Sequence, residues 1–109
     1  MEDSTHYIQV ATAIDSEEGA LKIADALVSR HLAACVHIWP LTSMYWWQGK
    51  KETAREWLCT AKTRRELYEQ VERCIRENHP YEVPEVLATP VLDGSQEYLE
   101  WIDAETAQP

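Results

Sequence analysis

Residues 33–62, AACVHIWPLTSMYWWQGKKETAREWLCTAK, contain the pattern that decides the fold. Residues 33–41 are apolar at nearly every position, and residues 43–47 continue this run up to a turn, QGKK, at residues 48–51. β-Branched and aromatic residues that end at a glycine-containing turn are typical of a strand entering a hairpin. We therefore predict a strand that leads into this turn and a return strand over residues 53–62.

The segment before the hairpin predicts a strand followed by a helix. Residues 7–13 form a short apolar run with β-branched members, and we expect them to be the first strand. Asp15 and Glu18 have the spacing of a capping box, after which apolar residues recur at steps of three and four. This periodicity predicts a helix of about 15 residues.

The segment after the hairpin repeats the pattern. Thr63 and Glu66 form a second potential capping box, and the helix they start should end before Pro80, because the residue preceding a proline is pushed out of the helical region. Residues 86–92 predict a fourth strand, and residues 93–95 start a short C-terminal helix. The order β-α-β-β-α-β-α predicts an α+β fold of the split β-α-β type.

Composition narrows the class of protein. The chain has 109 residues, with 10 Lys and Arg against 19 Asp and Glu, a net charge of −9. This length predicts one domain over residues 1–109, with residues 1–6 and 104–109 as flexible tails.

The acidic balance argues against a nucleic acid or membrane partner, because both attract an excess of Lys and Arg. The acidic N-terminus does not resemble a signal peptide, and no apolar run approaches the roughly 20 residues that span a bilayer. We expect a cytoplasmic protein.

Both faces of the predicted sheet are apolar. Two helices can cover one face of a four-stranded sheet, so the other face of a monomer should carry polar side chains. In the second strand, however, Val36 and Ile38 point to one face while Cys35, His37 and Trp39 point to the other. Five Trp residues add aromatic area of the kind that is enriched at interfaces. We predict an obligate homo-oligomer that buries the helix-free face.

The segment HPYEVPE, residues 79–85, is the first candidate site. Its imidazole, phenol and carboxylates could bind a divalent ion or a polar ligand, and its two prolines fix the backbone. The alternative is a rigid connector whose acids are solvated. Cys35 and His37, alternate residues of a strand, could present sulfur and nitrogen to a soft ion, or could simply pack in an interface. Glu56 and Lys62 could form a polar pair, for which a solvated ion pair is the default interpretation.

Motifs of enzymes and of nucleotide-binding proteins are absent from the sequence. There is no G-x-S-x-G motif, and the three glycines are isolated, so no phosphate-binding loop is present. The three cysteines form no C-x-x-C pair, which argues against a disulfide framework or a zinc ribbon. We predict that the protein is not an enzyme.

Five blocks of sequence carry a family resemblance. They are Leu32-Ala33-Ala34-Cys35-Val36, Ser43-x-Tyr45-x-Trp47-x-Gly49-Lys50, Glu56 with Lys62-Thr63, residues 79–85, and Tyr98-x-x-Trp101. In this order and spacing the chain resembles the CutA family, the divalent-cation tolerance proteins, over residues 8–102. The resemblance implies a ferredoxin-like fold, β-α-β-β-α-β plus a short C-terminal helix, and a cytoplasmic homotrimer with its sheets packed inward. It also implies a role in tolerance of copper or other divalent metals.

The resemblance further implies a site between subunits. There it would place a weakly bound Cu(II) or other divalent cation, with His79, Glu82 and Glu85 as metal ligands and Trp47, Lys62 and Tyr81 in a ligand cleft. Some family members carry a Cys near Ala11 and a His at the position of Asn78, and neither residue here offers a ligand for a soft metal. The alternative function is a PII-like trimer that binds a small ligand or signals, without catalysis.

Overall fold

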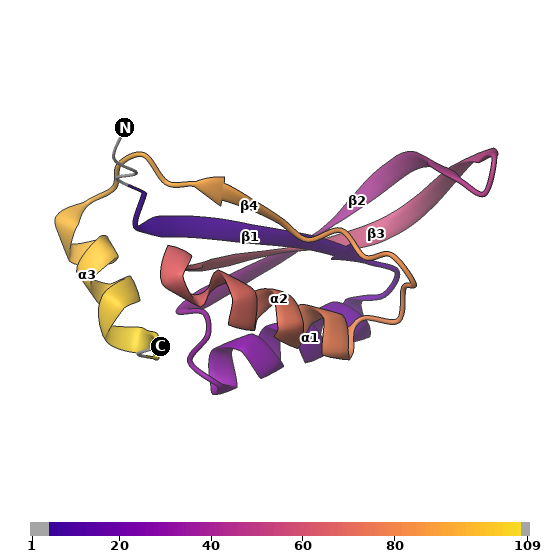
Figure 1. The fold of residues 1–109 in the computed structure, drawn as a ribbon. Coiled ribbons are helices and arrows are strands. Elements are labelled where there is room, and N and C mark those ends of the chain that lie inside the picture. The colour runs from indigo at the N-terminus through magenta and orange to yellow at the C-terminus, as the bar shows by residue number, and fades with distance from the viewer. Residues whose placement is uncertain (1–4, 108–109) are drawn as a thin grey trace.

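The computed structural model describes residues 5–107 and confirms the predicted order of elements. The elements are β1 (Tyr7–Ile14), α1 (Glu17–Ser29), β2 (Cys35–Trp47), β3 (Lys50–Arg64), the short 3-10 helix η1 (Arg65–Leu67), α2 (Tyr68–Asn78), β4 (Leu87–Pro90) and α3 (Gln96–Glu105). The strands form one four-stranded antiparallel sheet in the order β2-β3-β1-β4. Helices α1 and α2 pack on one face of this sheet, as Figure 1 shows. The fold is therefore ferredoxin-like.

The residues that start the helices differ from the prediction. Helix α1 is capped by Ser16, whose Oγ accepts a 3.0 Å hydrogen bond from the backbone N–H of Gly19, and not by Asp15. Thr63 does not cap a helix, because it lies inside β3 and its hydroxyl donates a 2.6 Å hydrogen bond to the carbonyl of Leu32. A threonine hydroxyl can donate to a buried carbonyl at the end of a strand as readily as it can cap the N-terminus of a helix.

Strand β3 is longer than the predicted residues 53–62, and together with β2 it projects beyond the sheet. The pairing of β1 with β3 stops at Ile14 and Trp57, whereas β2 and β3 remain paired from there to Trp47 and Lys50. Residues 41–56 therefore form a two-stranded ribbon, here called the arm, which stands clear of the body in Figure 1. Its turn has positive φ at both central positions, 49° at Gln48 and 79° at Gly49, as a tight hairpin requires.

The hydrophobic core lies between the sheet and helices α1 and α2. Its fully buried members come from β1, β3, η1 and both helices, and include Val10, Ile14, Ile23, Leu27, Cys59, Leu67, Val71, Cys74 and Ile75. Cys59 and Cys74 are buried and pack as small apolar side chains, whereas Cys35 is only partly buried. The core is thus one-sided.

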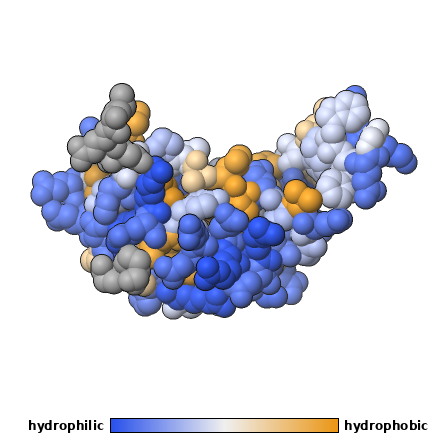
Figure 2. Space-filling model, in the orientation of Figure 1, coloured by the Kyte–Doolittle hydropathy of each residue, from blue (hydrophilic) through white to orange (hydrophobic). Residues whose placement is uncertain are grey.

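The opposite, helix-free face of the sheet exposes apolar side chains. Trp39 of β2 is 43% exposed and Leu87 of β4 is 61% exposed. Figure 2 shows hydrophobic side chains along the hollow of this face, between the arm and the N-terminal end of β1. The prediction that both faces of the sheet are apolar is correct.

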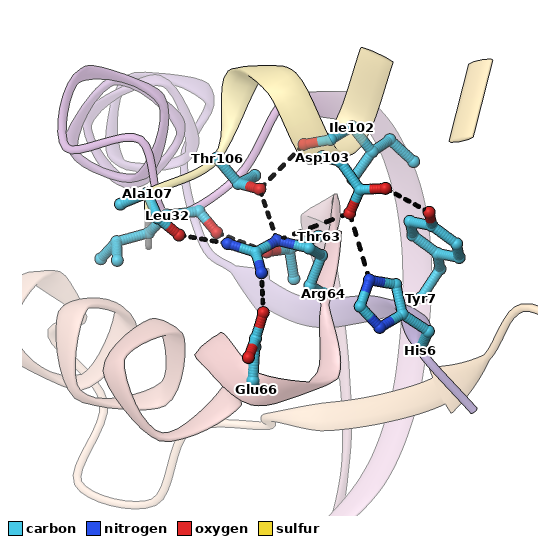
Figure 3. A network of polar contacts seen from close by, with 10 residues as sticks. All are labelled: His6, Tyr7, Leu32, Thr63, Arg64, Glu66, Ile102, Asp103, Thr106 and Ala107. Carbon is cyan, nitrogen blue, oxygen red and sulfur yellow. Dashed lines mark hydrogen bonds and ion pairs between the residues drawn. The ribbon is translucent and has the colours of Figure 1, made fainter. Parts of the chain in front are cut away.

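A buried arginine fixes helix α3 to the end of the sheet. The side chain of Arg64 is only 4% exposed, forms an ion pair with Glu66, and donates hydrogen bonds to the hydroxyl of Thr106 and the carbonyl of Ala107 (Figure 3). Residues 104–107, which we predicted to be part of a flexible tail, belong to α3 or to this network. Of the rest of the predicted tails, residues 1–4 and 108–109 lie outside the described part of the chain, and His6 contacts Asp103 of α3.

Asp103 links the same network to the start of β1. It accepts hydrogen bonds of 2.5 Å from the hydroxyl of Tyr7 and 3.1 Å from the ring of His6 (Figure 3). Partial desolvation opposes ionisation of Asp103, but these hydrogen bonds and the charges of His6 and Arg64 lower its pKa overall. The hydrogen bond to Asp103, with partial burial and the nearby negative charges, raises the pKa of Tyr7 to about 12.

Candidate functional site

The segment of residues 79–85 connects α2 to β4, beside the point where the arm leaves the sheet. Helix α2 ends at Asn78, as the position of Pro80 predicts. The amide of Asn78 donates a 2.8 Å hydrogen bond to the carbonyl of Cys74, which closes the last turn of the helix. The segment that follows has no regular secondary structure, so side-chain contacts fix its path.

His79 uses both of its ring nitrogens inside the protein. Its side chain is buried, and Nε2 lies 2.8 Å from the carbonyl oxygen of Ala13, which can only accept, so Nε2 donates. Nδ1 then accepts a 3.2 Å hydrogen bond from the backbone N–H of Tyr81. These two bonds define a neutral imidazole without a free lone pair, so a metal ion would have to displace one of them. His79 holds the backbone of Tyr81 against β1.

Tyr81 and Glu56 form the central contact of the site. The phenol of Tyr81 donates a 2.6 Å hydrogen bond to Oε2 of Glu56, and Glu56 is only 5% exposed. Burial raises the pKa of Tyr81, and the hydrogen bond and negative charge of Glu56 raise it further. The phenol therefore remains a hydrogen-bond donor at neutral pH and orients a buried carboxylate.

A second carboxylate lies near this contact. Partial desolvation raises the pKa of Glu85, and the like charge of Glu56 adds to the shift. Glu85 and Glu82, the two predicted acidic ligands, are both exposed. Glu56, Tyr81 and Glu85, here called the carboxylate site, therefore bring together two acids that repel each other. Sequence reasoning placed Glu56 with Lys62 instead, because the 25 residues between Glu56 and Tyr81 hide their contact.

The predicted ligand cleft is not assembled within one protomer. Trp47 lies at the tip of the arm and pairs with Lys50, whereas Lys62 lies at the opposite end of β3 and pairs with Cys35. Lys50 and Lys62 are twelve positions apart along the strand, which corresponds to about 40 Å. Trp47, Lys62 and Tyr81 could therefore meet only if different protomers supplied them.

The second candidate, Cys35 with His37, has its imidazole engaged. Nζ of Lys62 lies 3.1 Å from Nδ1 of His37, and because an ammonium can only donate, it occupies the lone pair of Nδ1. Within residues 5–107, no three His, Cys, Asp or Glu side chains are grouped so that they could hold a metal ion. One protomer thus offers pairs of potential ligands rather than a complete coordination shell.

Comparison with known proteins decides the family. The family model described as "CutA1 divalent ion tolerance protein" matches residues 8–105. The chain belongs to the CutA family. A CutA divalent-cation tolerance protein of Thermus thermophilus is 43% identical over 98 residues, which cover 89% of this chain and 95% of that protein. CutA family members are named for tolerance of divalent cations rather than for a reaction.

Solved CutA structures share this architecture. The crystal structure of CutA1 from Oryza sativa has a TM-score of 0.93 at 38% identity, and the alignment covers 96% of this chain and 97% of that one. The Thermus thermophilus structure has a TM-score of 0.90 at 41% identity and covers 93% of this chain and 99% of that one. At these values the comparison confirms the ferredoxin-like fold.

The expected cytoplasmic location is wrong as an inference from the CutA family. CutA relatives from Oryza sativa and Arabidopsis thaliana are named chloroplastic, and a solved CutA from Archaeoglobus fulgidus is described as periplasmic. The chain spans 58% and 60% of the length of the two plant proteins. No helix within the described residues is long and apolar enough to cross a membrane.

Proposed function

We propose that the protein acts as a homotrimer that binds a divalent cation at the carboxylate site and so contributes to divalent-cation tolerance. The observation that supports this most directly is the contact of Tyr81 with the buried carboxylate of Glu56, beside which Glu85 has a raised pKa. A cation that binds between two neighbouring carboxylates relieves the electrostatic repulsion between them.

Assembly into a homotrimer is supported by the helix-free face. Trp39 and Leu87 expose large apolar surfaces there, and further copies of the chain would remove them from water. The family resemblance selects a trimer among the possible oligomers. The mass of the purified protein at micromolar concentration tests this, and a monomeric mass would contradict it.

The chemistry of the donors constrains which cations fit. Carboxylate and phenol oxygens suit hard or borderline ions such as Mg²⁺, Mn²⁺ or Zn²⁺, whereas copper favours nitrogen and sulfur ligands. The engagement of both His79 nitrogens therefore weakens the case for copper. Water or a neighbouring protomer would complete the coordination shell.

Titration calorimetry tests the cation site. The tag-free protein would be titrated with Mn²⁺, Zn²⁺ and Cu²⁺ at physiological ionic strength, beside Glu85→Gln and the matched control Glu82→Gln. Saturable binding should be lost in Glu85→Gln and kept in Glu82→Gln, since both side chains are exposed but Glu82 lies outside the carboxylate site. Equal binding by the wild type and Glu85→Gln would contradict the proposal, and loss only in Glu82→Gln would return the site to the ligands first predicted.

The PII-like alternative is not favoured. The chain matches the CutA model over residues 8–105, and the cleft residues Trp47 and Lys62 lie at opposite ends of β3. A cleft built from Trp47, Lys62 and Tyr81 of different protomers stays a prediction of the trimer. A structure of the assembled protein would test it by the distances between these side chains.

A further inference from the structure

The two faces of the arm differ in a way that the proposed function does not use. Alternation along β2 places Tyr45 and Trp47 on the helix-free side, which continues the face that a homotrimer would cover. Met44 and Trp46 point to the other side, and they are 67% and 74% exposed. Because helices α1 and α2 do not extend under the arm, nothing within the described body covers this second face (Figure 1).

Positive charge accompanies these exposed apolar residues. The register pairs Trp46 with Lys51, Met44 with Thr53, and Thr42 with Arg55, so these six residues form one surface, here called the arm patch. The patch has two cations and no acid, since Glu52 points to the opposite face. The arm, residues 41–56, contains three basic residues and two acids, a net charge of 3 − 2 = +1, whereas the rest of the chain carries −9 − 1 = −10.

Distance separates the arm from the acidic body. Lys50 at the tip is seven positions along the strand from Trp57, where β1 stops pairing, which corresponds to about 23 Å. The Debye length at physiological ionic strength is about 8 Å. The field of the body is therefore largely screened at the tip, and an anionic surface that approaches the tip meets the local positive charge.

We propose that the arm patch binds the anionic surface of a lipid membrane as a peripheral contact. An exposed Trp beside Lys and Arg is the combination found at bilayer interfaces, where the indole enters the headgroup layer and the basic groups reach the phosphates. Peptides bind instead in grooves or along sheet edges. Trp46 and Met44 project from the flat face of a ribbon, which favours a soft surface over a peptide. The expectation of no membrane partner came from the net charge of the whole chain. The net charge does not show that the basic arm patch lies apart from the acidic body.

Vesicle binding tests the proposal with the full, tag-free chain. Flotation would be measured with vesicles of phosphatidylcholine containing 30% phosphatidylserine, and with phosphatidylcholine alone, alongside the wavelength of Trp emission. We expect association with the anionic vesicles only, a shift of emission to shorter wavelength, and weaker association in 0.5 M NaCl. Trp46→Ser should lose the emission shift, and Lys51→Glu should weaken binding about tenfold.

Two exposed positions away from the arm supply matched controls. Leu92→Ser removes an apolar side chain that is 95% exposed, and Lys22→Glu reverses an exposed charge on α1, so both variants should bind like the wild type. The proposal is overturned if the wild type does not float with anionic vesicles, or if Trp46→Ser and Lys51→Glu bind them as well as the controls do. Binding of polyglutamate without binding of vesicles would also overturn it, and would assign the patch to an acidic polypeptide.

Discussion

The hydroxyl of Tyr81 lies 2.6 Å from Oε2 of Glu56 and joins the connector after α2 to the strand at the base of the arm. Hydrogen bonds to charged groups contribute more to stability than neutral ones, about 1.5 to 3 kcal/mol. We predict that Tyr81→Phe lowers the free energy of unfolding by about 1–2 kcal/mol, because it leaves a buried carboxylate without its donor. Urea unfolding at fixed protein concentration measures this. Tyr98→Phe on α3, where the side chain is 39% exposed, is the control, and an equal effect of both variants would contradict the assigned role.

Thr12 predicts a stabilising substitution. Its side chain is 1% exposed, and among the described residues its hydroxyl has no hydrogen-bond partner. Thr12→Val keeps the shape and removes an unsatisfied polar group, so it should raise the free energy of unfolding by about 1 kcal/mol. Thr63→Val is the matched control, because the Thr63 hydroxyl does bond to Leu32 and its loss should cost about 1–2 kcal/mol. Thermal or urea unfolding of the two variants should show changes of opposite sign in the free energy of unfolding, and changes of the same sign would contradict this assignment.

The lowered pKa of Asp103 predicts a loss of stability in acid. The folded state holds this carboxyl ionised, so its contribution is complete above the ordinary Asp pKa of about 3.9 and is lost as the pH falls through the lowered value. Asp103→Asn should therefore be destabilised by about 1 kcal/mol at pH 7, a figure reduced for solvent screening. The difference from wild type should shrink below pH 4. A difference that stays constant from pH 7 to pH 3 would contradict this assignment.

Glu85 predicts the opposite pH dependence. Because its pKa is raised, its ionised form destabilises the fold at neutral pH, and this penalty is relieved as the pH falls through the raised pKa. Without added cations, Glu85→Gln should be more stable than wild type at pH 7.5, by less than about 1 kcal/mol since the group is largely solvated. The gain should disappear near pH 4. The measurement is made in EDTA, which removes any bound cation. If Glu85→Gln were less stable than wild type in EDTA, repulsion between Glu85 and Glu56 would be contradicted.

Sequence periodicity predicted the fold well because local patterns encode it. The order of strands and helices and the end of α2 before Pro80 all follow from spacing within a few residues. The two apolar faces of the sheet follow from alternation along β2. Capping residues were less certain, since Asp15 and Ser16 are both good caps and only the backbone angles decide between them.

The site was harder to predict because its contacts are long-range. Nothing local signals that Tyr81 reaches Glu56, or that the ring of His79 spans from the carbonyl of Ala13 to the backbone of Tyr81. A histidine beside acids has the composition of a metal site, yet its hydrogen bonds make it a backbone support. The length of β3 was underestimated for a similar reason, because its pairing beyond Trp57 depends on β2 alone.

The strand order β2-β3-β1-β4 has a consequence for how the chain folds. Strand β1, which begins the sequence, lies between β3 and β4, so its hydrogen bonds are completed only by residues made much later. Tyr7 likewise waits for Asp103, 96 residues away. Such separation gives the protein a high contact order, which slows folding because distant segments must meet before any contact compensates for the lost chain entropy. A nascent chain that ends before residue 87 leaves β1 as an open sheet edge, which is a template for pairing with another chain.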